Sequence, residues 1–293
     1  MKTSCAIVVT FNRLELLKLT IEKLSNQTVK LNEILIINNA STDGTTEYLS
    51  TLNKQNVTVI NLPKNVGGAG GFHEGIKTAY NKNHEYMWIM DDDTIAEENA
   101  FEELLNGLEV LKGRNVGFVC SNVLYKDGSA CIMNTPKVFP IWNDYASKGA
   151  VRLFATSFVS MLVTRDIVAE VGLPIKEFFI WGDDAEFTKR INKNHEGYMI
   201  TSSVVYHYMN ENRGVHIIDE SANRVDRYFY EYRNKFFIAR TEGIKSFMEY
   251  LEYFFRTLAL IVVRKNESKL KKVKIVTKGF IKGIMFKPNI EKV

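Results

Sequence analysis

The chain has 293 residues and a net charge of +4, with 45% hydrophobic and 25% charged residues, a composition typical of a globular protein with an ample core. Its apolar stretches are shorter than the roughly 18 residues that a membrane-spanning helix requires, and its first residues lack the basic-then-apolar pattern of a signal peptide. Three cysteines without paired spacing indicate buried thiols in a reducing cytosol, rather than disulfides or a zinc site. We therefore expect a cytoplasmic protein with one large domain, or one large domain and a small appendage.

Short apolar runs alternate with helix-like segments over the first 112 residues. Strands are predicted at 6–10, 34–37, 57–62 and 87–90. Helices are predicted at 14–24, in a segment that ends near 52, at 72–80 and at 97–112. This alternation indicates the α/β class with a doubly wound, mostly parallel sheet.

Three consecutive carboxylates, Asp91, Asp92 and Asp93, follow the apolar run at 87–90. A buried strand that delivers acids at its C-terminal end is how open α/β sheets build ligand sites. Because side chains alternate along an extended chain, we expect Asp91 and Asp93 to point the same way and to share one cation. Oxygen ligands suit Mn²⁺ or Mg²⁺, and such an ion suits a diphosphate. A solvated turn before a helix is the alternative for an isolated acidic triplet.

Four glycines occupy five positions between 67 and 71, just before the predicted helix at 72–80. Glycine permits positive φ and a close approach of the backbone to a ligand, and the first amides of a helix can face an anion. The segment is not a dinucleotide fingerprint, because it does not follow the first strand. A flexible connector is the competing interpretation.

The second half of the body is less regular. We predict a strand at 116–124, loops from 125 to 150, a strand at 155–163 and a strand at 204–208. Asp183 and Asp184 precede a predicted helix at 185–191 and follow two aromatic residues, Phe179 and Trp181. Paired acids can simply cap a helix, but aromatic faces stack on sugars, and a neighbouring carboxylate can accept a hydroxyl proton.

The chain changes character after residue 215, so we divide it into a catalytic domain at 1–215 and a helical, basic extension at 216–293. Residues 264–287 hold nine Lys or Arg and one Glu, a net +8, which leaves the rest near −4. Bulky apolar residues alternate with these lysines, a pattern that favours contact with anionic lipid over a solvated tail. The apolar segment 244–263 is interrupted by charges, so it should pack on the body, self-associate or lie at a surface. No nucleic-acid recognition motif accompanies the charge, and we expect no nucleic-acid partner.

Four motifs, in this order, resemble the family 2 glycosyltransferases with the GT-A fold. They are Val-Val-Thr-Phe-Asn-Arg at 8–13, Asn-Asn-Ala-Ser-Thr-Asp-Gly at 38–44, Asn-Val-Gly-Gly-Ala-Gly-Gly-Phe at 65–72 and Asp-Asp-Asp at 91–93. The glycine segment and the acidic triplet resemble those of the galactofuranosyltransferases. The resemblance covers the first 210 residues.

The resemblance implies a role for each candidate residue. It implies a metal, Mn²⁺ or Mg²⁺, that bridges the donor's diphosphate and is bound by Asp91, Asp93 and His207. It implies donor contacts from Thr10, Arg13, Asn38, Asn39, Asp43, Gly67, Gly68 and Asp92, with Arg13 on a phosphate and residues 38–43 around a pyrimidine. Where many members carry an aspartate, Asn38 or Asn39 accepts the base's N3–H without charge assistance. It also implies that Asp184 is the base and Asp183 orients the acceptor hydroxyl, or the reverse, beside acceptor-binding Trp181 and Phe179.

The resemblance further implies an inverting, metal-dependent transfer of galactofuranose from UDP-galactofuranose onto a growing, lipid-linked surface glycan at the inner face of the cell membrane. A rhamnosyl- or hexosyltransferase that uses a dTDP- or UDP-pyranose is the nearest alternative. A sugar nucleotidyltransferase would require a glycine-rich loop after the first strand, where Phe11-Asn12-Arg13 stands. A noncatalytic membrane adaptor is disfavoured by the intact acids at 91, 93 and 184. The aromatic C-terminal helices leave homo-oligomerisation open.

Overall fold

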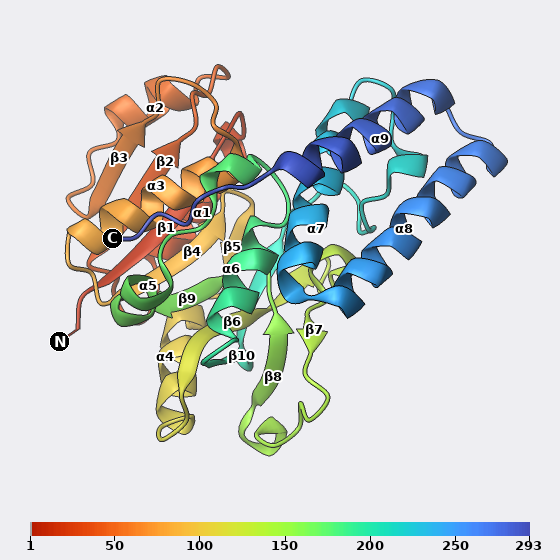
Figure 1. The fold of residues 1–293 in the computed structure, drawn as a ribbon. Helices are drawn as coiled ribbons and strands as arrows, with labels where there is room; N and C mark the ends of the chain where they lie inside the picture. Colours follow the sequence, from red (N-terminus) through yellow and green to blue (C-terminus); the bar gives the residue numbers. More distant parts are fainter. Residues whose placement is uncertain (1) are drawn as a thin grey trace.

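The computed structural model describes residues 2–293, which form an α/β unit and, beside it, a bundle of three long helices (Figure 1). In the first part of the sheet, β1 (Ser4–Thr10), β2 (Glu33–Asn38), β3 (Val57–Asn61) and β4 (Tyr86–Asp91) are parallel. The strand order is β3-β2-β1-β4-β9-β6-β10-β8-β7. The remaining strands are β5 (Thr94–Ala96), β6 (Val116–Tyr125), β7 (Lys137–Val138), β8 (Ala150–Ala155), β9 (Met161–Thr164) and β10 (Glu196–His207). The predicted α/β class with a mostly parallel sheet is confirmed.

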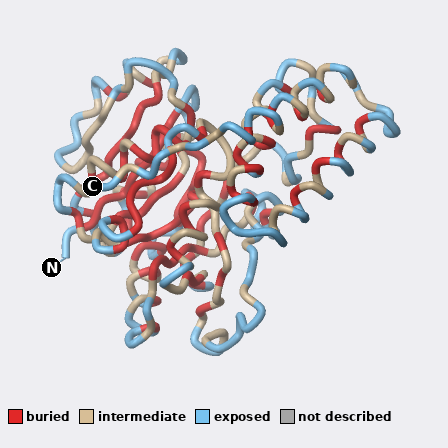
Figure 2. The backbone as a smooth tube through the Cα atoms, viewed as in Figure 1, coloured by how far each residue is buried: buried red, intermediate tan, exposed pale blue. Residues whose placement is uncertain are grey.

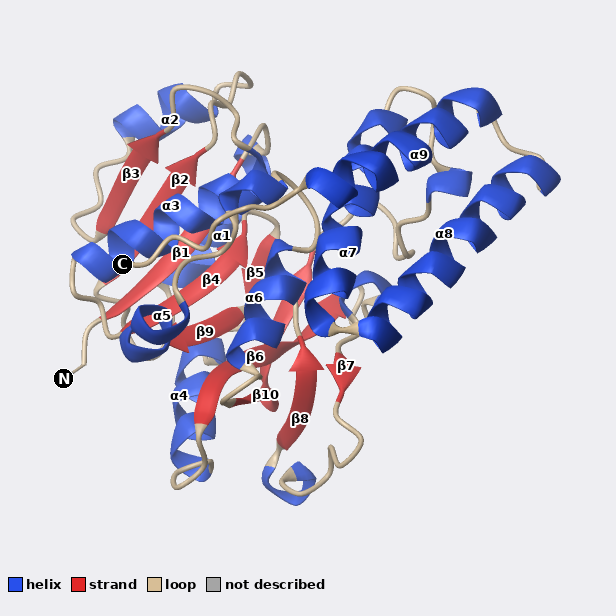
Figure 3. Cartoon of the chain, viewed as in Figure 1, coloured by secondary structure: helices blue, strands red, loops and turns tan. Residues whose placement is uncertain are grey.

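Helices cover both faces of the sheet, which explains why β1 and β2 are buried at every position and mostly apolar. On β1, Ala6 and Val8 face a core shared with α1 (Leu14–Ser25), α2 (Thr45–Thr51) and α4 (Ala100–Val110). Cys5, Ile7 and Val9 face the opposite core, which is shared with α3 (Gly67–Asn81), α5 (Arg165–Val171) and α6 (Asp183–Ile191). Figure 3 shows these helices packed around the strands.

Three sequence expectations about elements were wrong. The segment 155–163 is not one strand, because β8 ends at Ala155 and β9 begins at Met161. The short strand β5 at 94–96 was not predicted, and the helix expected at 97–112 extends only over Ala100–Val110. The glycine segment is not a loop, because α3 begins at Gly67.

Close packing explains why glycines occur inside α3. A Cβ atom at Gly71 or Gly75 would overlap the side chains of Val9 and Ile7 of β1. These two glycines therefore let the helix lie close to the sheet, although glycine costs helix stability relative to alanine. The expected positive φ occurs at Gly67, where φ is +76°.

The C-terminal bundle consists of α7 (Tyr228–Glu242), α8 (Ile244–Val263) and α9 (Lys269–Met285). Aromatic contacts join the three helices, with Phe236 of α7 packed edge-on against Phe247 and Phe280. Glycines at 279 and 283 let α9 lie against α7, because a Cβ at either would crowd the α7 backbone or Phe236. The aromatic residues that suggested self-association thus pack largely inside the bundle (Figure 2).

The end of the chain returns to the α/β unit, where the C-terminus lies beside α3 (Figure 1). The backbone oxygen of Glu291 accepts a hydrogen bond of 2.9 Å from the amide of Leu173. Its carboxylate pairs with Lys77 and Lys176 at 2.7 Å and with His73 at 3.1 Å. We propose a boundary near residue 216 between the two units, with residues 286–293 packed back on the first. Within residues 2–293, no helix is both long enough and apolar enough to cross a membrane.

Candidate active site

The carboxyl ends of the parallel strands bring several candidate residues into one row. Thr10 at the end of β1 is paired in register with Asn38 at the end of β2, and Val9 is paired with Asp91 at the end of β4. The sequence motifs at 8–13, 38–44 and 91–93 therefore meet at one edge of the sheet, as expected of ligand sites in open α/β sheets.

A turn, and not an extended strand, brings Asp91 and Asp93 together. β4 ends at Asp91, Asp92 and Asp93 form a turn, and β5 then pairs antiparallel with β10. Thr94 lies opposite His207, so Asp93 is carried next to the histidine, and its Oδ1 is 3.2 Å from His207 Nε2. One ligand atom from each of Asp91, Asp93 and His207 lies within 4.8 Å of the other two. The expected alternation was thus the wrong reason for a convergence that the turn at 92–93 and the pairing of β5 with β10 produce.

The imidazole of His207 is held in position by a residue outside the motifs. Its Nδ1 is 2.7 Å from Oδ1 of Asn134, an acceptor that favours a proton on Nδ1 and leaves Nε2 directed at Asp93. Two carboxylates and a neutral imidazole form a donor set that suits Mn²⁺. The residues present therefore fit the implied ion.

Asp92 points away from this cluster, toward the first strand. Its Oδ2 accepts hydrogen bonds from the hydroxyl of Thr10 at 2.7 Å and from the amide of Phe11 at 3.3 Å. Burial raises the pKa of Asp92 to about 6, against the lowering effect of Arg13. The half-exposed guanidinium of Arg13 pairs with Asp93 and lies 3.7 Å from Asp92. Arg13 thus sits at the acid cluster with part of its surface open to solvent.

The loop after β2 uses its polar side chains mainly to hold its own shape. The side-chain nitrogen of Asn38 donates to Thr46 and Asn61, and the side-chain oxygen of Asn38 accepts from the backbone amide of Ser41 at 3.1 Å. Asp43 is exposed and accepts a hydrogen bond from the amide of Leu14 at 3.1 Å. These bonds fix the conformation of residues 38–43 next to α1.

Asn39 and the first turn of α3 connect this loop to the segment that contains Phe179. The side chain of Asn39 accepts from the amide of Val66 at 2.8 Å and donates to the carbonyl of Gly67 at 3.0 Å. A Cβ at Gly67 would overlap the carbonyl of Phe179, and that carbonyl accepts a hydrogen bond from the amide of Ala69. The closest neighbour of Gly67 is therefore the protein backbone, while Gly68 is less crowded.

Asp183 and Asp184 form the first turn of α6, which begins at Asp183, two residues earlier than predicted. Burial and, to a smaller extent, the charge of Asp91 raise the pKa of Asp184 to about 6. Burial and the neighbouring Asp184 raise the pKa of Asp183 well above its usual range, and Asp91 again adds to the effect. The charge of Asp91 therefore acts on both carboxyl groups of the pair.

The two candidate acceptor aromatics are half-buried and contact the helical extension. The Phe179 ring stacks on Tyr230 with ring centres 4.8 Å apart, and the Trp181 ring lies 5.0 Å from the guanidinium of Arg227. Both residues have positive φ, at +65° and +64°, a conformation that is costly for bulky side chains. The extension therefore forms part of the wall of the site.

Comparison with known proteins identifies the family of the chain. Residues 5–150 match Glycosyl transferase family 2. The chain belongs to this family. It is 24% identical over 258 residues to galactofuranosyltransferase GlfT1 of Mycolicibacterium smegmatis, a match that covers 83% of this chain and 85% of that protein.

Two solved structures share the GT-A fold with this glycosyltransferase. Staphylococcus aureus TarS, solved with UDP-GlcNAc, is 16% identical with a TM-score of 0.63, over 97% of this chain and 82% of that one. GalNAc-T7, solved with UDP, GalNAc and Mn²⁺, is 16% identical with a TM-score of 0.59, over 87% of this chain and 55% of that one.

Sequence analysis of the glycosyltransferase missed two asparagines, Asn134 and Asn234. The buried Asn234 of α7 donates its side-chain amide to the carbonyls of Phe178, Ile180 and Trp181 at 2.8–3.1 Å. It thereby holds the strained segment that leads to Asp183. No motif marks either asparagine, because each acts on a residue more than 50 positions away.

Proposed function

We propose that this glycosyltransferase transfers galactofuranose from UDP-galactofuranose, with inversion, to a hydroxyl of a growing, lipid-linked cell-surface glycan. The observation that carries the proposal is a set of contacts that link the segment before Asp183 to the carboxyl edge of the sheet, where Asn39 donates to the carbonyl of Gly67 and the Phe179 carbonyl accepts from the amide of Ala69. The effect of Asp91 on the pKa of both Asp183 and Asp184 agrees with this placement. The likeness to a mycobacterial galactofuranosyltransferase over most of both chains supports this choice of donor.

Asp91, Asp93 and His207 would hold Mn²⁺ or Mg²⁺. When bound, the ion would neutralise the diphosphate that leaves with the nucleoside. Asn134 keeps the His207 ring in position, and Arg13, whose side chain is 47% exposed, is available to a donor phosphate. We assign Thr10, Asn38, Asn39, Asp43, Gly67, Gly68 and Asp92 to the donor side of the site.

Asp184 acts as the general base in this proposal. It accepts the proton of the acceptor hydroxyl as the hydroxyl oxygen bonds to the anomeric carbon and the bond from that carbon to the diphosphate oxygen breaks. Its raised pKa, about 6, suits proton transfer near neutral pH. Asp183 orients the hydroxyl, and the faces of Trp181 and Phe179 hold the acceptor sugar.

We place the enzyme in the cytoplasm, at the inner face of the membrane, because a lipid-linked acceptor and the basic extension both suit an anionic bilayer. The exposed cations near the C-terminal end of α8 and along α9 support this location. Self-association of the extension is compatible with the same reaction.

A panel of sugar nucleotides tests the donor. The protein with Mn²⁺ is incubated with UDP-galactofuranose, UDP-galactopyranose, UDP-GlcNAc and dTDP-rhamnose, and slow release of nucleoside diphosphate is measured without acceptor. Fastest release from UDP-galactofuranose is expected. Faster release from a pyranose donor would assign the alternative rhamnosyl- or hexosyltransferase activity, and no release from any donor would favour a noncatalytic role.

Calorimetric titration tests the metal site. Mn²⁺ should bind in the presence of UDP, and Asp91→Ala should weaken this binding strongly because it removes one of three protein ligands. An unchanged titration curve for Asp91→Ala would exclude this cluster as the metal site.

A further inference from the structure

The outer side of α8 carries a row of exposed apolar side chains. Ile244, Met248, Phe255 and Val262 are between 58% and 77% exposed, and their spacing of four and seven residues places them on one side of the helix. A second row, with Tyr250, Phe254, Thr257 and Ile261, is buried inside the bundle. The helix therefore has two apolar sides, and the bundle covers only one (Figure 2).

Exposed apolar side chains also lie at the turn between α8 and α9 and along α9. Val263 is 80% exposed and Leu270 is 89% exposed, and on α9 Ile281 and Ile284 are at least half exposed. The helices have 20 and 17 residues, so the surface extends for about 25–30 Å. We call it the α8–α9 face. Exposed apolar surface of this extent usually marks an interaction site.

Cations surround the α8–α9 face. Among the basic residues of 264–287, only Lys271 has an acidic partner within the described part of the chain, namely Asp226. Lys272 is buried and donates to the carbonyl of Ile218. The exposed cations without an acidic partner are Arg264, Lys265, Lys274, Lys278, Lys282 and Lys287. Glu249, Glu252 and Glu267 are the exposed acids of α8 and the turn.

We propose that the α8–α9 face lies on an anionic lipid bilayer, with its apolar row at the boundary between headgroups and acyl chains and its cations among the phosphates. The contact is an exposed helix surface and not a free basic tail, because Glu291 and Lys292 hold the chain after α9 to the α/β unit. The lipid contact itself does not depend on the proposed function. Only its use, which is access to a lipid-linked acceptor, rests on the proposed function.

Charge favours a bilayer over a second copy of the chain as the partner. A symmetric dimer through this face would bring two identical sets of cations together, at a cost in repulsion. Anionic headgroups supply the opposite charge, and acyl chains accept the apolar row. Neither requires another protein.

Vesicle flotation of the full-length protein, without donor or acceptor, tests the proposal. The protein should float with vesicles of phosphatidylglycerol and phosphatidylcholine, and much less with phosphatidylcholine alone, and added salt should weaken the binding. Phe255→Ser with Val262→Ser should lower the vesicle affinity about tenfold or more, because two apolar anchors are lost. Lys274→Gln with Lys278→Gln should have a similar effect.

Matched changes elsewhere are the controls. Val110→Ser with Ile141→Ser removes exposed apolar side chains far along the chain from this face, and Lys112→Gln with Lys126→Gln removes exposed cations. Both controls should bind vesicles as the wild type does. Circular dichroism and thermal melting confirm that each variant is folded.

Other outcomes would overturn the proposal. Absence of binding to anionic vesicles, or equal binding by the face variants and the wild type, excludes the α8–α9 face as a lipid contact. A dimer in sedimentation velocity that Phe255→Ser with Val262→Ser dissociates, without vesicle binding, assigns the face to a second copy. Donor hydrolysis in solution is measured in parallel, so a failure of lipid binding is distinct from a failure of the proposed function.

Discussion

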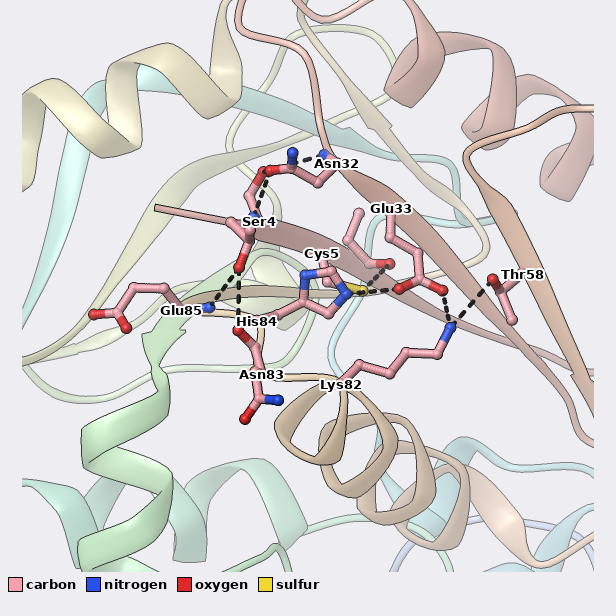
Figure 4. Close-up of polar contacts among 11 residues, drawn as sticks. Ser4, Cys5, Asn32, Glu33, Thr58, Lys82, Asn83, His84 and Glu85 are labelled. Carbon is pink, nitrogen blue, oxygen red and sulfur yellow. Dashed lines mark hydrogen bonds and ion pairs between the residues drawn. The ribbon is translucent and has the colours of Figure 1, made fainter. Parts of the chain in front are cut away.

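Two clusters of possible metal ligands lie at opposite edges of the same sheet, one at the carboxyl ends of the parallel strands and the other at their amino ends. Asp91, Asp93 and His207 lie at the carboxyl edge, and Cys5, Glu33 and His84 lie at the amino edge, each with ligand atoms within 4.8 Å of one another. Figure 4 shows the second cluster, in which Glu33 already pairs with Lys82 and accepts from His84 Nε2 at 2.6 Å. The Cys5 thiol, whose pKa burial raises, donates to the carbonyl of Ala6.

The two clusters differ in how far nearby cations neutralise their buried carboxylates. At the amino edge, one carboxylate has both a lysine and a histidine as partners, and hydrogen bonds from Lys82, Thr58 and His84 lower its pKa in spite of burial. At the carboxyl edge, burial raises the pKa of Asp91, Asp92, Asp183 and Asp184, and Arg13 is the nearby arginine. An excess of buried negative charge calls for a cation, whereas a neutralised cluster holds strands together.

The largest effect is expected for Asp184→Asn at the carboxyl edge. Loss of a positioned base should lower the transfer rate about 10²- to 10⁴-fold. The melting temperature should be unchanged or higher, because a buried charge is removed. Radiolabel transfer from donor to acceptor and thermal melting measure the two expectations. Normal transfer would refute the assignment of the base.

A smaller loss is expected for Asn234→Ala, which releases three carbonyls of the segment before Asp183. Misplacement of a catalytic group by about 1 Å can cost about 10²-fold in rate. The rate constant kcat should fall while UDP and Mn²⁺ affinities stay unchanged, and Asn234→Gln is the control for simple destabilisation. An equal loss of nucleotide binding would show that Asn234 acts through general folding.

Asn134→Ala removes the hydrogen-bond partner of His207, one of the three candidate metal ligands. Loss of the partner that orients a ligating histidine typically costs 10- to 100-fold in metal affinity. Titration with Mn²⁺ in the presence of UDP measures this directly. The matched change at the other cluster, Glu33→Gln, should leave the Mn²⁺ affinity as it is, and a loss there would contradict our division of roles.

Glu33→Gln should instead reduce stability. It breaks the charged hydrogen bonds of Glu33 with Lys82 and His84, and we expect a loss of about 1–3 kcal/mol in the free energy of unfolding. Urea denaturation followed by circular dichroism measures this. Turnover at a temperature well below the melting point should be preserved.

The smallest effect is on pH dependence, and its sign differs between the edges. The folded pKa of Asp184, about 6, lies above the ordinary value for aspartate, so the folded state holds more protons and stability falls as pH rises through this window. The folded pKa of Glu33 is lowered, so its contribution is present above the ordinary glutamate value and is lost as pH falls below it. In the absence of metal, the free energy of unfolding of Asp184→Asn, obtained from melting curves, should exceed that of the wild type by about 1 kcal/mol above pH 6. In acid the two free energies should be equal.

The sequence by itself determined the fold class, the family and the edge of the sheet that carries the motifs. Apolar runs such as 34–37 and 87–90 can only be strands buried on both faces, and polar residues that follow parallel strands must collect at one edge. These inferences depend on neighbours along the chain, whose spacing the sequence states directly.

Only the tertiary structure decided which side chains meet and how they are held. The pairing of β5 with β10 brings Asp93 next to His207, Asn134 and Asn234 act from distant segments, and Lys82 neutralises Glu33. It also decided which apolar side of α8 is buried and which is left exposed. Each of these facts is a contact between residues far apart in the chain, and local periodicity carries no information about such contacts because they arise from the packing of whole elements.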